Sequence, residues 1–159
     1  DLVSGLTMPD YPGEAKWDAP IESIEFISDF QVSDIEPSAG DIRVTELPGP
    51  RAKFKPMVSS FGGFMNVNPL IKGKDGMVYF KTRYRAAKAG EAILYFGADG
   101  PSKIWVNGQE IAVFPDLTNP ATPDKCKVDV RFRKGLNDIL VAMDTNDGKA
   151  WGIYARIGK

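Results

Sequence analysis

The stretch GADGPSKIWVNGQEI, which runs from Gly97 to Ile111, decides the fold class of this chain. Its dipeptides Asp99-Gly100 and Asn107-Gly108 readily adopt the positive φ angles that tight turns between strands require. Between these turns, Ile104 and Val106 alternate with their neighbours at the period of a half-buried strand. The stretch therefore predicts a short strand between two tight turns, as in an antiparallel β-sandwich.

The same alternation continues on both sides of this stretch. Residues 77–86 and 126–133 alternate apolar and charged side chains, residues 91–98 are apolar nearly throughout, and residues 41–47 alternate more weakly. The alternating segments predict strands with one dry and one solvated face, and the apolar segment predicts a central, covered strand. No long segment repeats apolar residues at helical spacing. We predict an all-β fold, an antiparallel sandwich of about eight or nine short strands.

The alternation also predicts which side chains face solvent. On the strand at 77–86, Tyr79 falls on the same face as Lys81 and Arg83, so we expect that face to be wet. In the segment at 41–47, Ile42 and Val44 fall on one shared face.

The length of 159 residues suits a single domain. Residues 1–20 contain Pro9, Pro12 and Pro20 and show no periodicity, so we predict an extended lead-in or linker there. Residues 21–159 are then one β-sandwich domain.

Charge and hydropathy exclude several partners. Lys and Arg number 20 against 21 Asp and Glu, so the basic excess typical of nucleic-acid binding is missing. Five basic residues on two predicted strands could form a local patch, but a solvated strand face is the favoured interpretation. They are Lys81, Arg83, Arg85, Arg131 and Arg133. No apolar run reaches about 18 residues, so we expect no membrane partner.

The sequence contains no histidine and one cysteine, Cys126. The lack of histidine excludes Ser-His-Asp and Cys-His nucleophilic sites and His-ligated zinc. Cys126 cannot form an internal disulfide, and we expect a small, partly buried side chain. Paired carboxylates could still act as a glycosidase acid and base, but each candidate, such as Asp99 or Asp116, has a simpler turn or loop role. We therefore expect a protein that is not an enzyme.

Four motifs follow one another in the second half of the chain. They are Asp99-Gly100, Trp105-Val106-Asn107-Gly108, Lys134-Gly135-Leu136-Asn137 and Trp151-Gly152. Their order over residues 75–158 resembles that of a galactose-binding-like jelly roll, a fold found in sugar-binding-like accessory modules of glycoside hydrolases. The resemblance implies a jelly-roll β-sandwich and carbohydrate as the ligand class. The motif residues are mainly turn formers and core residues, so they do not mark a ligand site.

Proteins usually bind sugars on exposed aromatic rings, because C–H patches of a pyranose pack on an apolar platform. Trp105 lies opposite Ile104 and Val106, where it is either a platform or, as the pattern favours, part of the sheet packing. Trp17, in the lead-in, either pins that segment or serves as a platform. Trp151 shares a face with Ile153 and Ile157, so we predict that it belongs to the core.

Polar loop residues would bind the sugar hydroxyls. The loop PDLTNPATPD at 115–124 supplies Asp116 and Asn119 close to Asp99, and residues 61–68 could form an opposite wall. A rigid polar connection remains the alternative for each residue. We predict an edge-loop site for one or two sugar units, formed by Asp99, Asp116 and Asn119 with Trp105.

No cofactor is expected with certainty, and calcium is the one metal to consider. The sequence DTNDG at 144–148 supplies oxygen ligands from Asp144, Asn146 and Asp147. Its spacing differs from that of a calcium loop, and a hairpin turn explains Asn146-Asp147-Gly148 equally well. A structural calcium and a simple turn therefore both remain open.

These observations give two main hypotheses. The first is a non-catalytic carbohydrate-binding module that tethers a secreted or periplasmic polysaccharide-degrading enzyme to its glycan. Its partners would be a poly- or oligosaccharide and a catalytic domain in a longer chain. The second is a structural accessory β-sandwich domain of a larger glycoside hydrolase, with no ligand of its own, which predicts that Trp105 and Trp17 are buried. A small stand-alone glycan-active enzyme is the third and least supported.

Overall fold

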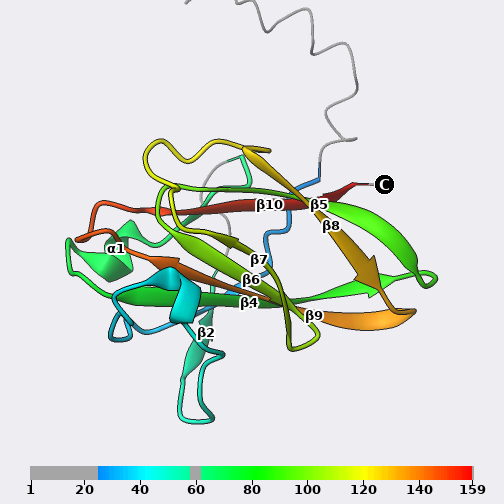
Figure 1. The fold of residues 1–159 in the computed structure, drawn as a ribbon, viewed down its shortest axis with the longest axis horizontal. Helices are drawn as coiled ribbons and strands as arrows, with labels where there is room; N and C mark the ends of the chain where they lie inside the picture. The colour runs from blue at the N-terminus through cyan, green and yellow to red at the C-terminus, as the bar shows by residue number, and fades with distance from the viewer. Residues whose placement is uncertain (1–24, 58–61, 159) are drawn as a thin grey trace, which may run out of the picture.

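The computed structural model describes residues 25–57 and 62–158, and these residues form two facing antiparallel sheets. The larger sheet has six strands in the order β2-β1-β4-β9-β6-β7. Their bounds are β1 Gln31–Ser33, β2 Phe54–Pro56, β4 Met77–Ala86, β6 Ser102–Val106, β7 Gln109–Phe114 and β9 Gly135–Asp144. The predicted all-β antiparallel sandwich is confirmed (Figure 1).

The smaller sheet has four strands in the order β3-β10-β5-β8. Their bounds are β3 Met65–Asn66, β5 Gly90–Ala98, β8 Cys126–Phe132 and β10 Gly152–Gly158. β5 lies between β10 and β8, as its apolar sequence predicted. Among the described residues, the one α-helix is α1, Asn68–Ile71, a single turn between β3 and β4. No helix in the described ranges is long and apolar enough to cross a membrane.

The core lies between the two sheets, and the alternating strands supply it. Val78 and Phe80 of β4 face Val128, Val130 and Phe132 of β8 across one continuous buried cluster. Phe30 and Phe80 pack edge to face at 6.2 Å within it. The alternation of apolar and charged residues in β4 and β8 therefore identified the inward faces correctly.

A second apolar cluster covers part of the outer face of the larger sheet. It consists of Ile42, Met77, Tyr79, Trp105 and Ala142. We call it the outer cluster. The prediction that Tyr79 lies on a wet face is wrong, since Tyr79 is only 7% exposed. Its hydroxyl donates a hydrogen bond to the carbonyl of Glu46 at 2.9 Å.

The segment that covers this face does not form the strand suggested for residues 41–47. It contains a short 3₁₀ helix, η3, at Ile42–Val44, and Asp41 caps it by accepting a hydrogen bond from the Arg43 amide. As a result Ile42 is buried whereas Val44 is 62% exposed, so the two do not share a face. The aspartate cap competes with strand formation, and the weak alternation could not reveal this.

Lys103 anchors this covering segment to the sheet. Its ammonium group, although buried, donates hydrogen bonds to the carbonyls of Arg43 at 2.9 Å and Thr45 at 2.8 Å. It also lies 3.2 Å from a carboxylate oxygen of Glu110. These partners compensate the burial of a charge that would otherwise be costly.

The five basic residues considered as a patch are divided between the two sheets. Lys81, Arg83 and Arg85 belong to β4, and Arg131 belongs to β8 in the other sheet. Because β4 and β8 turn their apolar residues toward the shared core, their basic residues lie on opposite outer faces. Arg83 pairs with Asp138 at 3.3 Å and Arg131 pairs with Glu91 at 3.4 Å.

Candidate functional site

A pocket of about 700 Å³ opens at one end of the sandwich, where three loops meet. Its lining residues are Phe64, Asp99, Asn119, Pro120, Ala121, Gly148, Lys149, Trp151 and Tyr154. We call it the edge pocket. The structure thus brings Asp99 and Asn119 together, as expected from the sequence, and residues 61–68 contribute the predicted opposite wall through Phe64.

Asp99 builds this end of the molecule rather than displaying its carboxylate. The side chain is 5% exposed, and its Oδ1 accepts hydrogen bonds from the amides of Trp151 at 2.8 Å and Gly152 at 3.1 Å. Asp99 directly follows β5, and Gly152 begins β10. The carboxylate therefore fixes the backbone just before β10 begins.

Trp151 is the exposed tryptophan of the described chain, with 48% of its surface accessible. The prediction that it belongs to the core is wrong. β10 begins only at Gly152, so the alternation that buries Ile153 does not extend back to Trp151. Because Asp99 holds its amide, the indole is presented at the pocket instead of the core.

Two further aromatic residues lie beside Trp151. The rings of Tyr154 and Phe64 are 5.0 Å apart between centroids, and Tyr154 also lies 5.6 Å from Phe26. Both Tyr154 and Phe64 line the edge pocket with Trp151. The pocket thus combines aromatic surface with the Asn119 amide and the Lys149 ammonium.

The loop at 115–124 forms the other side of the edge pocket and is held by internal bonds. The ammonium group of Lys125 donates to the carbonyls of Thr118 at 3.0 Å and Pro120 at 2.9 Å. The guanidinium of Arg156 forms two hydrogen bonds with the Asp124 carboxylate, at 2.8 and 2.7 Å. This carboxylate is the main cause of the raised pKa of Arg156. The bonds fix the loop over β5 and β10 with Asn119 toward the pocket.

The structure does not gather all the residues expected at the site. Asp116 is exposed on the same loop as Asn119 but does not line the edge pocket. Trp105 is 5% exposed and belongs to the outer cluster on the larger sheet, so the placement of Trp105 in the edge-loop site is corrected. Trp17 and the lead-in at 1–20 lie outside the described residues. The sequence signal that could have identified Trp151 is its position directly before a strand rather than within one.

The residues considered for calcium are engaged in a turn. Asp144 accepts hydrogen bonds from the Ser38 hydroxyl at 2.7 Å and from the Asn146 amide at 2.8 Å. Asn146 and Asp147 adopt positive φ angles of 51° and 58°, as a tight turn requires. Within residues 25–57 and 62–158, no group of three acidic, histidine or cysteine side chains is arranged to hold a metal ion. A tight turn therefore explains why Asp144, Asn146 and Asp147 occur here.

Cys126 is partly buried at the start of β8, as expected. Burial raises the pKa of its thiol, and the nearby Lys125 opposes this shift only partly. A raised pKa keeps the thiol protonated at neutral pH, which is the opposite of what a nucleophile needs.

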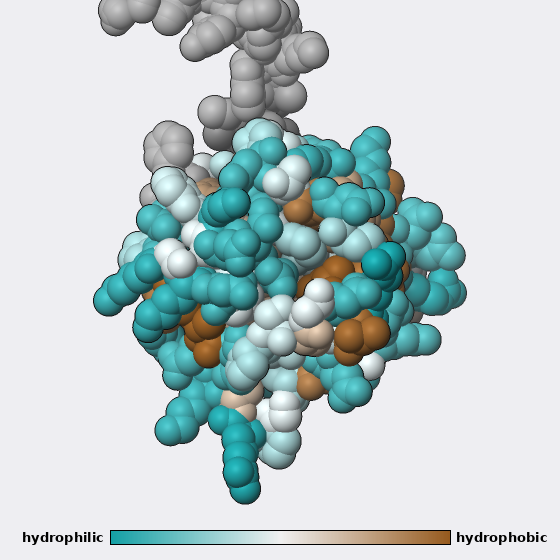
Figure 2. Space-filling view, turned by 60° about the vertical axis from the view of Figure 1, so that its left-hand side comes forward, coloured by the Kyte–Doolittle hydropathy of each residue, from teal (hydrophilic) through white to brown (hydrophobic). Residues whose placement is uncertain are grey.

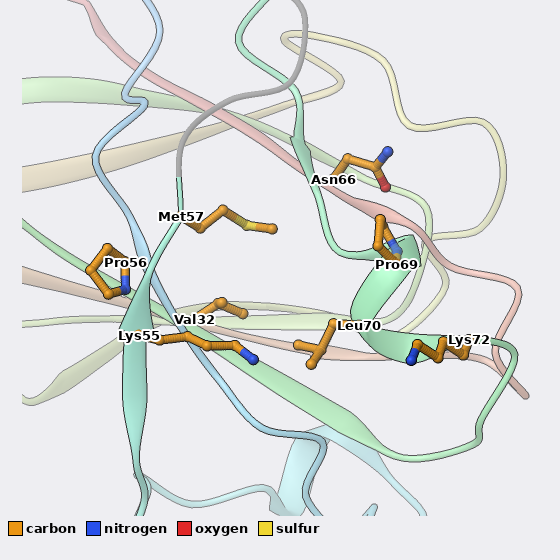
Figure 3. Close-up of a pocket in the computed structure, with 8 residues that line it drawn as sticks. All are labelled: Val32, Lys55, Pro56, Met57, Asn66, Pro69, Leu70 and Lys72. Carbon is orange, nitrogen blue, oxygen red and sulfur yellow. The ribbon is translucent and has the colours of Figure 1, made fainter.

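A second hollow of about 500 Å³ lies between β2 and α1. Val32, Met57 and Leu70 give it an apolar surface, and Lys55 and Lys72 lie along one side (Figure 3). None of its eight lining residues is aromatic. It therefore offers no platform for a pyranose ring.

The molecular surface at the loop end is largely hydrophilic. Figure 2 shows the apolar residues there as separate small patches among hydrophilic side chains. Such a surface suits a ligand that is itself amphipathic better than it suits a large apolar partner.

No family model matches the sequence, and no curated protein matches it either. Solved structures do resemble it. A β-glucosidase from Kluyveromyces marxianus aligns with a TM-score of 0.55 at 15% identity, over 92% of this chain and 18% of that one. A β-glucuronidase from Ruminococcus gnavus gives 0.51 at 13% identity, over 84% of this chain and 28% of that one. One from Faecalibacterium prausnitzii gives 0.50 at 19% identity, over 76% of this chain and 21% of that one.

These similarities concern the fold. The neighbours are glycoside hydrolase chains, and the present chain spans less than a third of the length of each. The likeness is therefore to one part of a larger enzyme chain, and it shows the fold of that part.

Proposed function

We propose that this chain is a non-catalytic carbohydrate-binding module that holds a polysaccharide-degrading enzyme on its glycan, with the sugar bound in the edge pocket. The observation that carries the proposal is the half-exposed ring of Trp151 beside Tyr154 and Phe64. These rings give an apolar platform, and Asn119 and Lys149 stand beside it to bind hydroxyls. The structural likeness to parts of glycoside hydrolase chains supports the same assignment.

The shape of the edge pocket limits what it would hold. Its volume of about 700 Å³ falls in the range of small-ligand pockets. We expect one or two sugar units to fill it, at a chain end or along a short stretch. Affinity should accordingly stop rising beyond about three units, because a pocket saturates once its subsites are filled.

The test is calorimetry of the intact chain against plant and algal oligosaccharides, with and without calcium. Trp151→Ala should weaken binding about tenfold or more, which corresponds to about 1.4 kcal/mol. Leu136→Ala is the matched control, because Leu136 is 41% exposed and is the second residue of β9, at the opposite end of the sandwich. Equal affinity of the two variants would assign the sugar to another site.

A second function is favoured by a different observation. If the chain is a structural accessory domain that binds no ligand, Trp105 is expected to be buried, and Trp105 is 5% exposed. On this alternative, the domain packs against the catalytic part of a longer glycoside hydrolase. Failure to bind any sugar in the panel, with or without calcium, would favour it. Turnover of a glycan by the isolated chain would contradict both proposals.

A further inference from the structure

Another concave surface crosses the outer face of the larger sheet, away from the edge pocket. It has a volume of about 700 Å³, and its lining residues come from loops and strands far apart in the sequence. They are Asp29, Gln31, Leu47, Pro48, Lys81, Thr82, Arg83, Trp105, Gly108, Asp138, Ile139 and Leu140. We call it the sheet groove.

The strand register explains how this surface forms. Gln31 of β1 pairs with Lys81 of β4, Lys81 pairs with Leu140 of β9, and Leu140 pairs with Trp105 of β6. These four residues therefore form one row across four strands. Two residues further along β4 and β9, Arg83 pairs with Asp138. Leu47 and Pro48, on the segment that covers the outer cluster, border the row.

The indole N–H of Trp105 is a buried donor that no acceptor satisfies within the described ranges. Trp105 is 5% exposed, and the Lys103 ammonium lies 5.5 Å from the centroid of its ring. A cation over the ring does not accept a hydrogen bond. Buried tryptophan N–H groups usually have an acceptor, and leaving one unpaired is unfavourable. Because Trp105 lines the sheet groove, a ligand in the groove can provide the missing acceptor.

The positive and negative charges of the sheet groove balance, which favours a neutral ligand. Lys81 and Arg83 are matched in number by Asp29 and Asp138. Arg83 lies 3.3 Å from Asp138, and Asp29 accepts a hydrogen bond from the Thr82 hydroxyl at 2.8 Å. Lys81 lies 4.2 Å from the centroid of the Phe54 ring. The groove therefore has no net charge and is rich in donors and acceptors around the apolar Leu140.

We propose that the sheet groove is a second binding site, for a neutral oligosaccharide, in which a sugar oxygen accepts a hydrogen bond from the Trp105 indole. Sugar hydroxyls both donate and accept, so they match mixed polar groups without adding charge. A peptide strand is a poorer match, because it binds a sheet by pairing with an edge, and the row runs across the face. The site does not depend on the edge pocket.

The experiment follows the indole N–H signals of the ¹⁵N-labelled full chain by NMR. The sequence has three tryptophans, so three indole signals are expected, and Trp17→Phe, Trp105→Phe and Trp151→Phe assign them. Cellotetraose, xylotetraose, mannotetraose and laminaritetraose are the neutral probes. At least one should shift the Trp105 signal saturably, and the shift should persist in Trp151→Ala.

Two variants test the contacts. Trp105→Phe keeps a ring but removes the N–H, and should weaken binding in the groove about tenfold, as monitored by the backbone amide of Leu140. Gln31→Ala, at an exposed position of the row, should weaken it several-fold without unfolding the protein. Leu136→Ala should leave this affinity unchanged.

The outcomes separate the two proposals. A Trp151 shift without a Trp105 shift overturns the groove and keeps the edge pocket, and the reverse pattern overturns the edge pocket alone. If tetragalacturonate or an extended peptide shifts the Trp105 signal at lower concentration than every neutral probe, the assignment of ligand class is wrong. If no probe shifts the Trp105 signal, the groove is not a glycan site.

Discussion

Tyr79 shows how one side chain couples the outer face of the larger sheet to pH. Its ring is buried in the outer cluster, its hydroxyl donates to the carbonyl of Glu46, and desolvation, assisted by the charges of Glu36 and Glu46, raises its pKa. The unfolded chain releases this proton at the ordinary tyrosine pKa of about 10, whereas the folded chain retains it. The free energy of unfolding is therefore unaffected by Tyr79 below that pH and falls as the pH rises toward the folded pKa.

Tyr79→Phe should remove this alkaline loss. At neutral pH the variant should be less stable by about 1 kcal/mol, because the hydrogen bond to Glu46 is lost. Above about pH 10 the difference from the natural protein should shrink, because only the natural protein still has Tyr79, whose hydroxyl deprotonates on unfolding. Urea unfolding of both proteins from pH 7 to 11 measures this. A difference that stays constant over the whole range would contradict the assigned cause.

The two described tryptophans show what could be predicted for single residues. The period of the strand placed Trp105 correctly on the face opposite Ile104 and Val106. Its burial depends on η3, which is distant in sequence and carries only a weak alternation. Trp151 was misplaced because its environment depends on two hydrogen bonds to Asp99, and a pattern of hydropathy carries no information on such bonds.

At the scale of elements, the loop at 115–124 depends on a glycine in the strand beneath it. A Cβ on Gly97 would overlap the carbonyl oxygen of Thr122. The loop therefore lies directly against β5, and this contact positions Asn119, Pro120 and Ala121 as a wall of the edge pocket. The sequence placed a polar loop here but could not reveal the close approach.

Gly97→Ala should displace this loop. We expect a loss of stability of about 1–3 kcal/mol from the overlap and a several-fold weaker affinity for any sugar held in the edge pocket. Gly90→Ala is the matched control, because Gly90 lies in the same strand and a Cβ there would meet nothing within 4 Å. That variant should be as stable as the natural protein or slightly more stable.

Thermal unfolding and calorimetric titration of the two variants provide the comparison. If Gly97→Ala binds sugar with unchanged affinity, the loop does not contribute to the site.

The strands themselves were largely predictable, because β4, β5, β8 and β9 combine regular patterns with clear turn signals. The 3₁₀ helix η3 was not, because a single aspartate cap determines it.

At the scale of the whole molecule, polar side chains connect the two sheets at the end opposite the edge pocket. Asn137 is fully buried, and its amide donates to the carbonyls of Arg133 at 2.9 Å and Gly135 at 3.0 Å. Its Oδ1 accepts from the Asn107 side chain at 2.9 Å and from the Arg133 amide at 3.0 Å. Asn137 lies on β9 of the larger sheet, and Arg133 directly follows β8 of the smaller one.

These bonds give a physical reason for two sequence motifs that resemble the jelly-roll pattern. Asn107 belongs to the Asn-Gly turn after Trp105, and Asn137 belongs to the Lys-Gly-Leu-Asn step, 30 residues later. The side chains of the two motifs bind each other, and Asn107 also accepts a hydrogen bond from the Asp138 amide at 2.8 Å. The motifs therefore carry information about how the strands join, which explains why they indicated the fold and not a ligand.

Asn137→Ala should consequently lower stability without changing sugar affinity. It leaves the Arg133 amide and two carbonyls without their partner, so we expect a loss of about 3 kcal/mol. Asn107→Gly removes the same contact from the other side, and glycine keeps the positive φ of 51° without strain. In the double variant, the loss of stability should be smaller than the sum of the two single losses by about 1 kcal/mol, since the shared bond is lost only once.

Urea unfolding of the natural protein, the two single variants and the double variant gives the coupling, and titration of the folded protein with sugar gives the affinity. Additive losses would mean that the two asparagines act separately, and a weakened affinity would mean that this end of the sandwich also shapes the edge pocket.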